Sequence, residues 1–153
     1  MPQYSTRRRV QHSASDMFDL VSDIEKYPEF VPMCSAMHLR SSVDKGEGIT
    51  VMVAAMTVAY KLIRQTFTSR AILDKPKLKI LVEYLDGPFR HMQNRWTFTP
   101  TGEQACDIEF FIEYEFRSRT LAMLMGSLFD TVFRRMAAAF EQRADKVYGR
   151  PRG

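Results

Sequence analysis

The side chains most often used in catalysis and metal binding are few and scattered along this sequence. The three histidines (His12, His38 and His91) stand far apart, and the two cysteines (Cys34 and Cys106) show no metal-ligand spacing. A zinc or iron site needs several such ligands at characteristic separations. We therefore expect two buried, reduced thiols and no bound transition metal. His38 and His91 could act as general bases, but nothing nearby in the sequence orients them, so we assign them structural roles.

Catalytic motifs are also missing from the chain. The sequence contains no G-x-S-x-G elbow, no phosphate-binding loop, no G-x-G-x-x-G and no C-x-x-C. Four acids, Asp107, Glu109, Glu113 and Glu115, alternate with apolar residues and are typical of the solvent-facing side of a strand. These observations indicate no enzyme.

Positive charge gathers near the two ends of the chain. Lysine and arginine number 22 against 18 acids, a formal net charge of +4. The excess comes from Arg7 to Arg9 near the start, and from Arg134, Arg135, Arg143, Arg150 and Arg152 near the finish. Such patches could contact RNA or anionic lipid headgroups, although a solvated surface with a basic tail is the commoner explanation. We expect no DNA binding.

The last third of the chain carries the clearest structural pattern. From Cys106 to Phe116 apolar residues occupy every second position, as in an antiparallel strand with one dry face, although Phe111 interrupts the polar side. Ser118 can cap a following helix, which Gly149 and Pro151 would end near Tyr148. Its predicted apolar stripe consists of Leu121, Leu124, Met125, Leu128, Val132, Met136 and Phe140, widened by Phe129 and Phe133.

Shorter elements precede this strand and helix. A first strand over residues 4–11 leads to a short helix capped by Ser13 or Ser15, and Pro28 and Pro32 break the helical turn that follows. The further predicted strands cover residues 37–43, 47–55, 57–69, 78–84 and 89–98. Short turns between sequential strands favour a meander. The pattern predicts an α+β fold, a curved antiparallel sheet of about six or seven strands wrapped on a long C-terminal helix.

The length of 153 residues suits one domain over residues 1–153, with about 148–153 as a flexible tail. No stretch approaches the roughly 20 apolar residues of a membrane span, and the basic start lacks an apolar signal region. We expect a cytoplasmic protein, peripheral at most to the inner membrane.

Ten methionines are many for this length. Eight fall on or beside the predicted core faces: Met33, Met37, Met52, Met56, Met92, Met123, Met125 and Met136. Methionine adapts to irregular apolar surfaces, including ligands, although such stripes are more often plain core. A curved sheet closed by one helix can leave space between them, so an apolar ligand is the better functional hypothesis.

Several motifs resemble the coenzyme Q-binding family of the START-like, or polyketide-cyclase-like, helix-grip superfamily. The matching residues run in order through nearly the whole chain: Val21, Asp23, Tyr27, Pro28, Phe30, Pro32 and Cys34; Asp86 to Phe89; Asn94 to Trp96 and Phe98; Ile112, Tyr114 and Phe116; Phe140, Arg143 and Ala144. Met33 stands where the family often has tryptophan. The bacterial ribosome association toxin is similar in the same motifs.

This resemblance implies a hydrophobic cavity that binds the tail and ring of ubiquinone, in support of respiration or quinone biosynthesis, with no catalysis and no required cofactor. By the family motif, Tyr27, Pro28, Phe30 and Pro32 would shape the cavity mouth, and Gly87 to Phe89 the opposing loop. From periodicity rather than resemblance, we expect the interior to be lined by Trp96, Tyr114, Met125, Phe129, Val132 and Met136. The basic termini and the aromatic entrance loop would approach a membrane surface.

Two alternatives remain open. The first is a factor that binds the large ribosomal subunit through Arg7 to Arg9, Arg134 and Arg135, and so blocks subunit association. The second is a cyclase or hydrolase acting on a bulky ring, for which Arg90, His91 and Asn94 are the only polar candidates near the predicted cavity.

Overall fold

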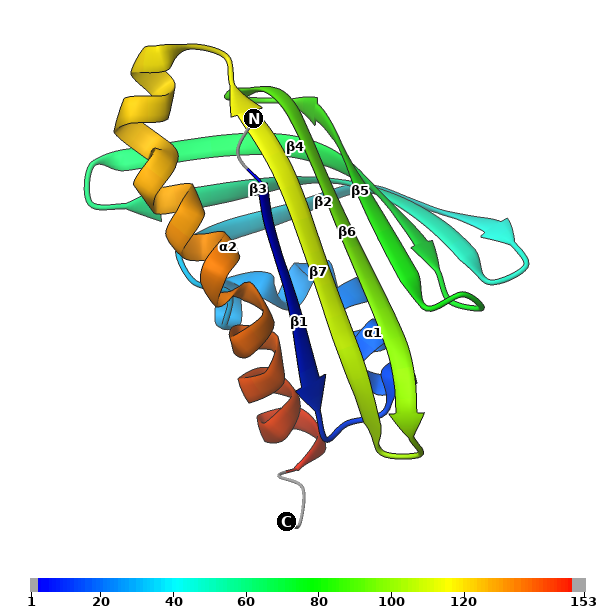
Figure 1. Cartoon of the computed structure of the whole chain (residues 1–153). Helices are drawn as coiled ribbons and strands as arrows, with labels where there is room; N and C mark the ends of the chain where they lie inside the picture. Colours follow the sequence, from blue (N-terminus) through cyan, green and yellow to red (C-terminus); the bar gives the residue numbers. More distant parts are fainter. Residues whose placement is uncertain (1–2, 150–153) are drawn as a thin grey trace.

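A seven-stranded antiparallel sheet curves around one long helix in the computed structural model, which describes residues 3–149 (Figure 1). The strands are β1 (Gln3–Val10), β2 (Cys34–Gly46), β3 (Ile49–Tyr60), β4 (Ile63–Asp74), β5 (Lys79–Asp86), β6 (Phe89–Gly102) and β7 (Ala105–Phe116). Helix α1 (Ala14–Ser22) and the 3-10 helix η1 (Ile24–Glu29) follow β1, and α2 (Arg119–Tyr148) ends the fold. The predicted helix-grip fold is confirmed.

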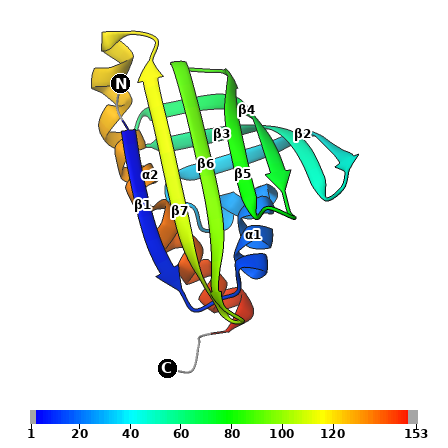
Figure 2. The same ribbon diagram turned by 45° about the vertical axis from the view of Figure 1, so that its right-hand side comes forward.

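The strand order is β1-β7-β6-β5-β4-β3-β2, a meander in which the first strand returns to pair with the last. Figure 2 shows β1 lying along β7 at one edge of the sheet. Ser13 caps α1 by accepting a hydrogen bond from the Asp16 amide, and Ser118 caps α2 in the same way from Leu121. Gly149 is the C-cap of α2, whereas Pro151 and the basic residues Arg150 and Arg152 lie outside the described residues.

One predicted strand is wrong. Residues 57–69 do not form a single extended run, because a tight turn at Lys61 and Leu62 separates β3 from β4. The turn contains no glycine, proline, asparagine or aspartate, and Lys61 itself takes a positive φ of 54°. The residues that usually mark a hairpin are therefore missing, so no local pattern in the sequence predicts this turn.

The predicted polar face of β7 also needs correction at its first acid. Asp107 is buried, because Arg7 and Arg9 of β1 close over it with nitrogen–oxygen distances of 3.0 and 2.8 Å. These charge-assisted hydrogen bonds, that from Arg9 first, hold the pKa of Asp107 below its ordinary value. Phe111 on the same face is covered by Arg95, whose guanidinium carbon lies 4.5 Å from the ring centre.

The predicted stripe of α2 is only partly buried. From Met125 to Phe140 the apolar positions face the sheet, but Leu124 is 60% exposed and Met123, expected beside the core, is 84% exposed. Part of the apolar stripe in the second turn of α2 therefore faces solvent, whereas Leu121 in the first turn packs against the core. No helix within residues 3–149 is long and apolar enough to cross a membrane.

Gly87 connects β5 and β6 at a position that only glycine fits. Its φ is +144°, and a Cβ atom there would lie 2.6 Å from the Cβ of Phe67 and 2.9 Å from its Cα. Because the obstruction includes backbone, the neighbour cannot simply rotate away. The glycine thus lets the β5–β6 connection pack directly on β4.

We predict that Gly87→Ala lowers the free energy of unfolding by about 2 kcal/mol, through positive-φ strain and the contact with Phe67. Gly126→Ala is the matched control, because Gly126 lies in α2 and a Cβ there meets nothing within 4 Å. That variant should be up to about 1 kcal/mol more stable than wild type. Urea unfolding of both variants checks the pair, and equal effects would contradict the packing argument.

A second prediction concerns acid stability. Because the folded-state pKa of Asp107 is lowered, its contribution to stability is present above the unfolded value of 3.8 and is lost as pH falls through the folded value. The stability difference between wild type and Asp107→Asn should therefore be largest at neutral pH and shrink towards zero in strong acid. Urea unfolding across this pH range measures it, and a pH-independent difference would count against the ion pairs.

Candidate functional site

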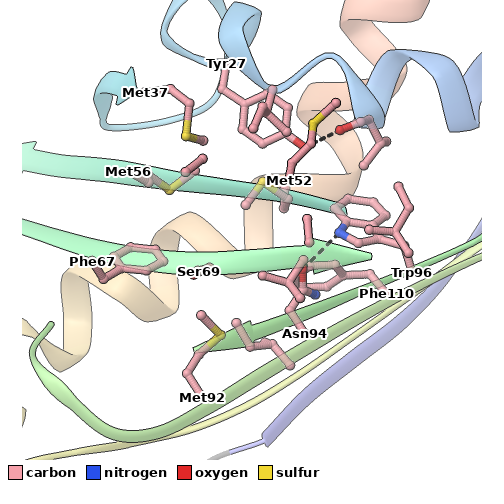
Figure 3. A pocket seen from close by; sticks show the side chains of 18 of the residues that line it. Tyr27, Met37, Met52, Met56, Phe67, Ser69, Met92, Asn94, Trp96 and Phe110 are labelled. Carbon is pink, nitrogen blue, oxygen red and sulfur yellow. Dashed lines mark hydrogen bonds between the residues drawn. The ribbon is translucent and has the colours of Figure 1, made fainter. Parts of the chain in front are cut away.

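The most distinctive site is an apolar cavity on the concave side of the sheet, with a volume of about 100 Å³ (Figure 3). Every strand except β1 contributes to its wall, together with α1, η1 and α2. Twenty residues line it: Val21, Ile24, Tyr27, Met37, Met52, Ala54, Met56, Phe67, Ser69, Ala71, Leu73, Ile80, Val82, Met92, Asn94, Trp96, Phe110, Ile112, Phe133 and Met136.

The cavity lies where the helix backbones approach the sheet least closely. Helix α2 contacts β1 and β7, α1 contacts β6 and β7, and η1 contacts β2. Side chains, rather than a helix lying directly on the strands, therefore cover the concave faces of β3, β4 and β5. Small residues at inward positions, Ala54 in β3 and Ser69 and Ala71 in β4, leave part of this space unfilled.

Methionine dominates the flexible part of the wall. Met37, Met52, Met56, Met92 and Met136 all line the cavity, and Figure 3 shows the sulfur atoms of the first four around it. A methionine side chain has several rotatable bonds and a polarisable sulfur, so it can move aside at low cost. The methionines therefore give this part of the cavity an adaptable wall.

Three polar side chains interrupt the apolar wall, and two of them are already engaged. The Asn94 amide donates to the carbonyl oxygen of Phe111 at 2.9 Å and accepts from the Trp96 indole at 3.0 Å. The Tyr27 hydroxyl donates to the carbonyl oxygen of Val21, and burial raises the pKa of Tyr27 far above its ordinary value. Ser69 differs, because its buried Oγ has no hydrogen-bond partner among the described residues.

Of the residues predicted for the interior, Trp96 and Met136 line the cavity. Met125, Phe129, Val132 and Tyr114 are buried elsewhere, in the contact between α2 and the sheet. They help to hold α2 in place: the Tyr114 ring lies 5.3 Å from that of Phe133, which does reach the cavity.

Of the residues predicted for the mouth, only Tyr27 borders the cavity. Phe30 packs on Phe140 of α2, with ring centres 5.0 Å apart, and Arg143 covers its other side. Pro28 is exposed and Pro32 partly exposed. Phe89 sits in the core against Phe67, Phe116 and Phe129 rather than at an entrance.

Sequence reasoning missed Ser69 and most of the methionines as members of one site. Met37, Met52, Met56 and Met92 could be recognised as an excess of methionine, but their convergence depends on strand register. Ser69 lies in the segment whose turn was not recognised, so its inward alternation with Phe67 and Ala71 could not be seen. The available signal was the run of small residues at alternate positions of β3 and β4.

The candidates for an enzymatic site do not come together. Asn94 lines the cavity, whereas Arg90 is exposed and His91 pairs with Glu113, Nε2 to Oε1, at 3.0 Å. Burial raises the pKa of both cysteine thiols to about 11, and neither lines the cavity. The described residues hold no group of three or more histidines, cysteines and acids arranged to bind a metal ion.

The basic patch expected at the N-terminal strand is largely neutralised. Arg7 and Arg9 bind Asp107, and Arg8 binds Glu141 of α2 with a nitrogen–oxygen distance of 2.6 Å. Arg134 pairs with Asp130 one turn earlier in α2. Arg135 is exposed and makes no ion pair within residues 3–149.

Several known proteins are similar to this chain in sequence or in structure. The chain is 38% identical to the ribosome association toxin RatA of Vibrio cholerae, over 97% of its own length and 99% of the relative's. It is 30% identical to the mitochondrial coenzyme Q-binding protein COQ10 homolog B of Xenopus laevis, over 97% of this chain and 60% of that one. The solution structure of an 18 kDa protein from Caulobacter crescentus superposes with a TM-score of 0.77 at 30% identity, covering 97% and 99% of the two chains.

Residues 10–141 match the family described as polyketide cyclase/dehydrase and lipid transport, a description that includes enzymes as well as carriers. The match spans strands β2 to β7, the cavity wall and most of α2. The chain therefore belongs to the polyketide cyclase/dehydrase and lipid transport family.

Proposed function

We propose that the protein binds an isoprenoid quinone in its cavity, as a carrier without catalysis of its own. The observation that carries the proposal is the unpaired Ser69 hydroxyl in a wall that is otherwise apolar or already hydrogen-bonded. A buried hydroxyl without a partner is costly, so it favours a ligand that brings an acceptor. A quinone carbonyl is such an acceptor, attached to an apolar ring and tail.

The size of the cavity bears on how such a ligand would enter. A volume of about 100 Å³ is small beside the several hundred Å³ typical of ligand pockets, so a quinone ring requires the wall to move. The five methionines provide that freedom. Within residues 3–149, no aspartate, glutamate, histidine, lysine or arginine lines the cavity, which supports binding rather than acid–base catalysis.

The energetics favour a carrier that works at a membrane. Burying an apolar tail gains about 25 cal/mol per Å² relative to water. A tail drawn from a bilayer is already out of water, so most of that gain disappears and the net affinity is modest. Such a ligand exchanges readily with a bilayer. The expected location, cytoplasmic and peripheral to the inner membrane, stays a prediction.

Ser69→Ala should weaken quinone binding by about threefold to tenfold, the range expected for one neutral hydrogen bond. Binding of a hydrocarbon of similar shape without oxygen should be unchanged. Fluorescence quenching of Trp96, which lines the cavity, measures both affinities.

Ser22→Ala is the matched control, because the Ser22 Oγ is also buried and unpaired but lies outside the cavity wall. It should leave both affinities at the wild-type value. Equal quinone affinity in wild type and Ser69→Ala would remove the argument for an oxygen-bearing ligand. Mass spectrometry of an organic extract of the protein from its native host identifies the ligand itself.

A second candidate function is association with the large ribosomal subunit, and it is favoured by the sequence relatives. Relatives named ribosome association toxin are 36% and 38% identical to this chain over 97% of its length, compared with 30% for the coenzyme Q-binding relative. The ion pairs of Arg7, Arg8 and Arg9 reduce the positive surface available to RNA. Arg135 is the residue of the expected patch that remains exposed and unpaired within residues 3–149.

If the protein binds ribosomal RNA, it should sediment with large subunits at low salt and be released as salt rises. Arg135→Glu should weaken that binding and reduce the dependence of log K on log salt concentration by about one. Arg40→Glu, an exposed site on β2, is the control and should sediment like wild type. Wild-type protein that stays at the top of the gradient at low salt would eliminate this candidate.

A further inference from the structure

Four large apolar side chains stand exposed on two neighbouring parts of the fold, the β3–β4 turn and the start of α2. Leu62, at the tip of the β3–β4 turn, is fully exposed; Met123 and Leu124, in the first turns of α2, are 84% and 60% exposed; and Tyr60 is 47% exposed. Figures 1 and 2 agree that the β3–β4 turn lies beside the N-terminal half of α2. We call Tyr60, Leu62, Met123 and Leu124 the apolar patch.

The fold alone does not explain the patch. An isolated exposed leucine is ordinary, but several on one side of a monomer mark a binding surface. Hairpin tips usually carry asparagine or glycine. This tip instead carries Lys61, which has a positive φ, followed by the fully exposed Leu62. In α2, Leu121 is partly buried against the core, while Met123 and Leu124 extend away from it.

The charges around the patch are mostly positive. Lys61 extends over the ring of Tyr60, with its Nζ 5.2 Å from the ring centre, and Arg64 is exposed two residues beyond Leu62. Arg117 and Arg119 are exposed at the start of α2. The first turn of α2 carries no acid, so the positive end of the helix dipole is not neutralised there.

The acids in this region offset the positive charge only in part. Glu115 is half-buried near the end of β7, Asp86 is exposed in the β5–β6 connection, and Asp130 is paired with Arg134. Four exposed cations, Lys61, Arg64, Arg117 and Arg119, therefore lie within about six residues along the chain of apolar side chains that can enter a lipid layer. Apolar side chains within a cationic rim complement the interface of an anionic bilayer, where tyrosine is also favoured.

We propose that the apolar patch docks the protein on bilayers containing anionic phospholipids, with Leu62, Met123 and Leu124 inserted below the headgroups. This surface differs from the basic termini and aromatic loop expected from the sequence, where Arg7, Arg8, Arg9 and Phe30 are engaged within the molecule. The proposal rests on the proposed function, because the bilayer on which the protein docks would be the source of the quinone.

The same elements connect the patch to the cavity. Tyr60 lies four residues beyond Met56 on β3, about 13 Å along the strand, and Leu124 precedes Phe133 by nine residues of α2, a similar distance. Docking would therefore place the elements that form the cavity wall against the bilayer.

The test is co-flotation with phosphatidylcholine vesicles, with and without phosphatidylglycerol, at low salt. Wild type should bind the phosphatidylglycerol vesicles and bind pure phosphatidylcholine much more weakly. Leu62→Glu and Leu124→Glu should each reduce the partition coefficient by at least about tenfold, the effect of losing one buried leucine side chain. Leu62 is fully exposed, so the thermal midpoint of Leu62→Glu should match wild type.

Val43→Glu is the matched control, because Val43 is an apolar residue of β2, 47% exposed, and β2 joins β3 at the opposite end from Tyr60. It should bind vesicles like wild type. The proposal is overturned if wild type binds neither vesicle, if phosphatidylglycerol makes no difference, or if Val43→Glu weakens binding as much as Leu62→Glu. Loss of ribosome sedimentation in Leu62→Glu with unchanged vesicle binding would instead assign the patch to a ribosomal partner.

Ligand loading separates this proposal from the proposed function. From detergent solution, Leu62→Glu should take up quinone with wild-type affinity, while its uptake from vesicles falls in proportion to vesicle binding. Ser69→Ala should bind vesicles normally. If wild type takes up no quinone yet shows patch-dependent vesicle binding, the quinone function fails and the docking surface stands. If wild type takes up quinone but its vesicle binding does not depend on the apolar patch, the docking surface fails and the quinone function stands.

Discussion

A single helix cannot cover the concave face of a seven-stranded sheet, and the shape of this molecule depends on that limit. Helix α2 lies against β1 and β7, and the two short helical segments cover β6 and β2. The middle strands meet the helices only through side chains such as those of Phe67 and Phe129. Several of their inward residues are small or flexible, so a cavity remains where larger side chains would have filled the space.

The interior consequently has a rigid aromatic part and an adaptable part lined by methionines, and the two meet at Phe67 and Phe133. Around Phe89 the rings of Phe67, Phe116 and Phe129 meet at centre distances of 5.1 to 5.6 Å, and aromatic packing of this kind fixes α2 against the sheet. In β3, methionines Met52 and Met56 face the cavity in place of rings. A ligand entering the cavity can displace the methionines at low cost, whereas Phe67 and Phe133 also take part in the aromatic contacts that hold the fold.

The sequence predicted what depends on local pattern, and it failed where distant segments meet. Period-two alternation located β7, and Ser118 and Gly149 located the ends of α2, because these signals lie within the element itself. In the sequence Asp107 resembles a surface acid, because no residue near it along the chain reveals that Arg7 and Arg9 of the paired strand β1 bind its carboxylate. Within α2, periodicity predicted burial but could not separate residues that touch the sheet from those that reach the cavity.

The five methionines of the cavity wall make the site chemically vulnerable as well as adaptable. Oxidation converts a thioether into a polar sulfoxide, which would bring an unsatisfied dipole into an apolar space. Redox-active cargo held beside these sulfur atoms would expose them to that reaction. Peroxide would thus damage the lining of the site before the aromatic core, and methionine sulfoxide reductases would be the enzymes able to restore it.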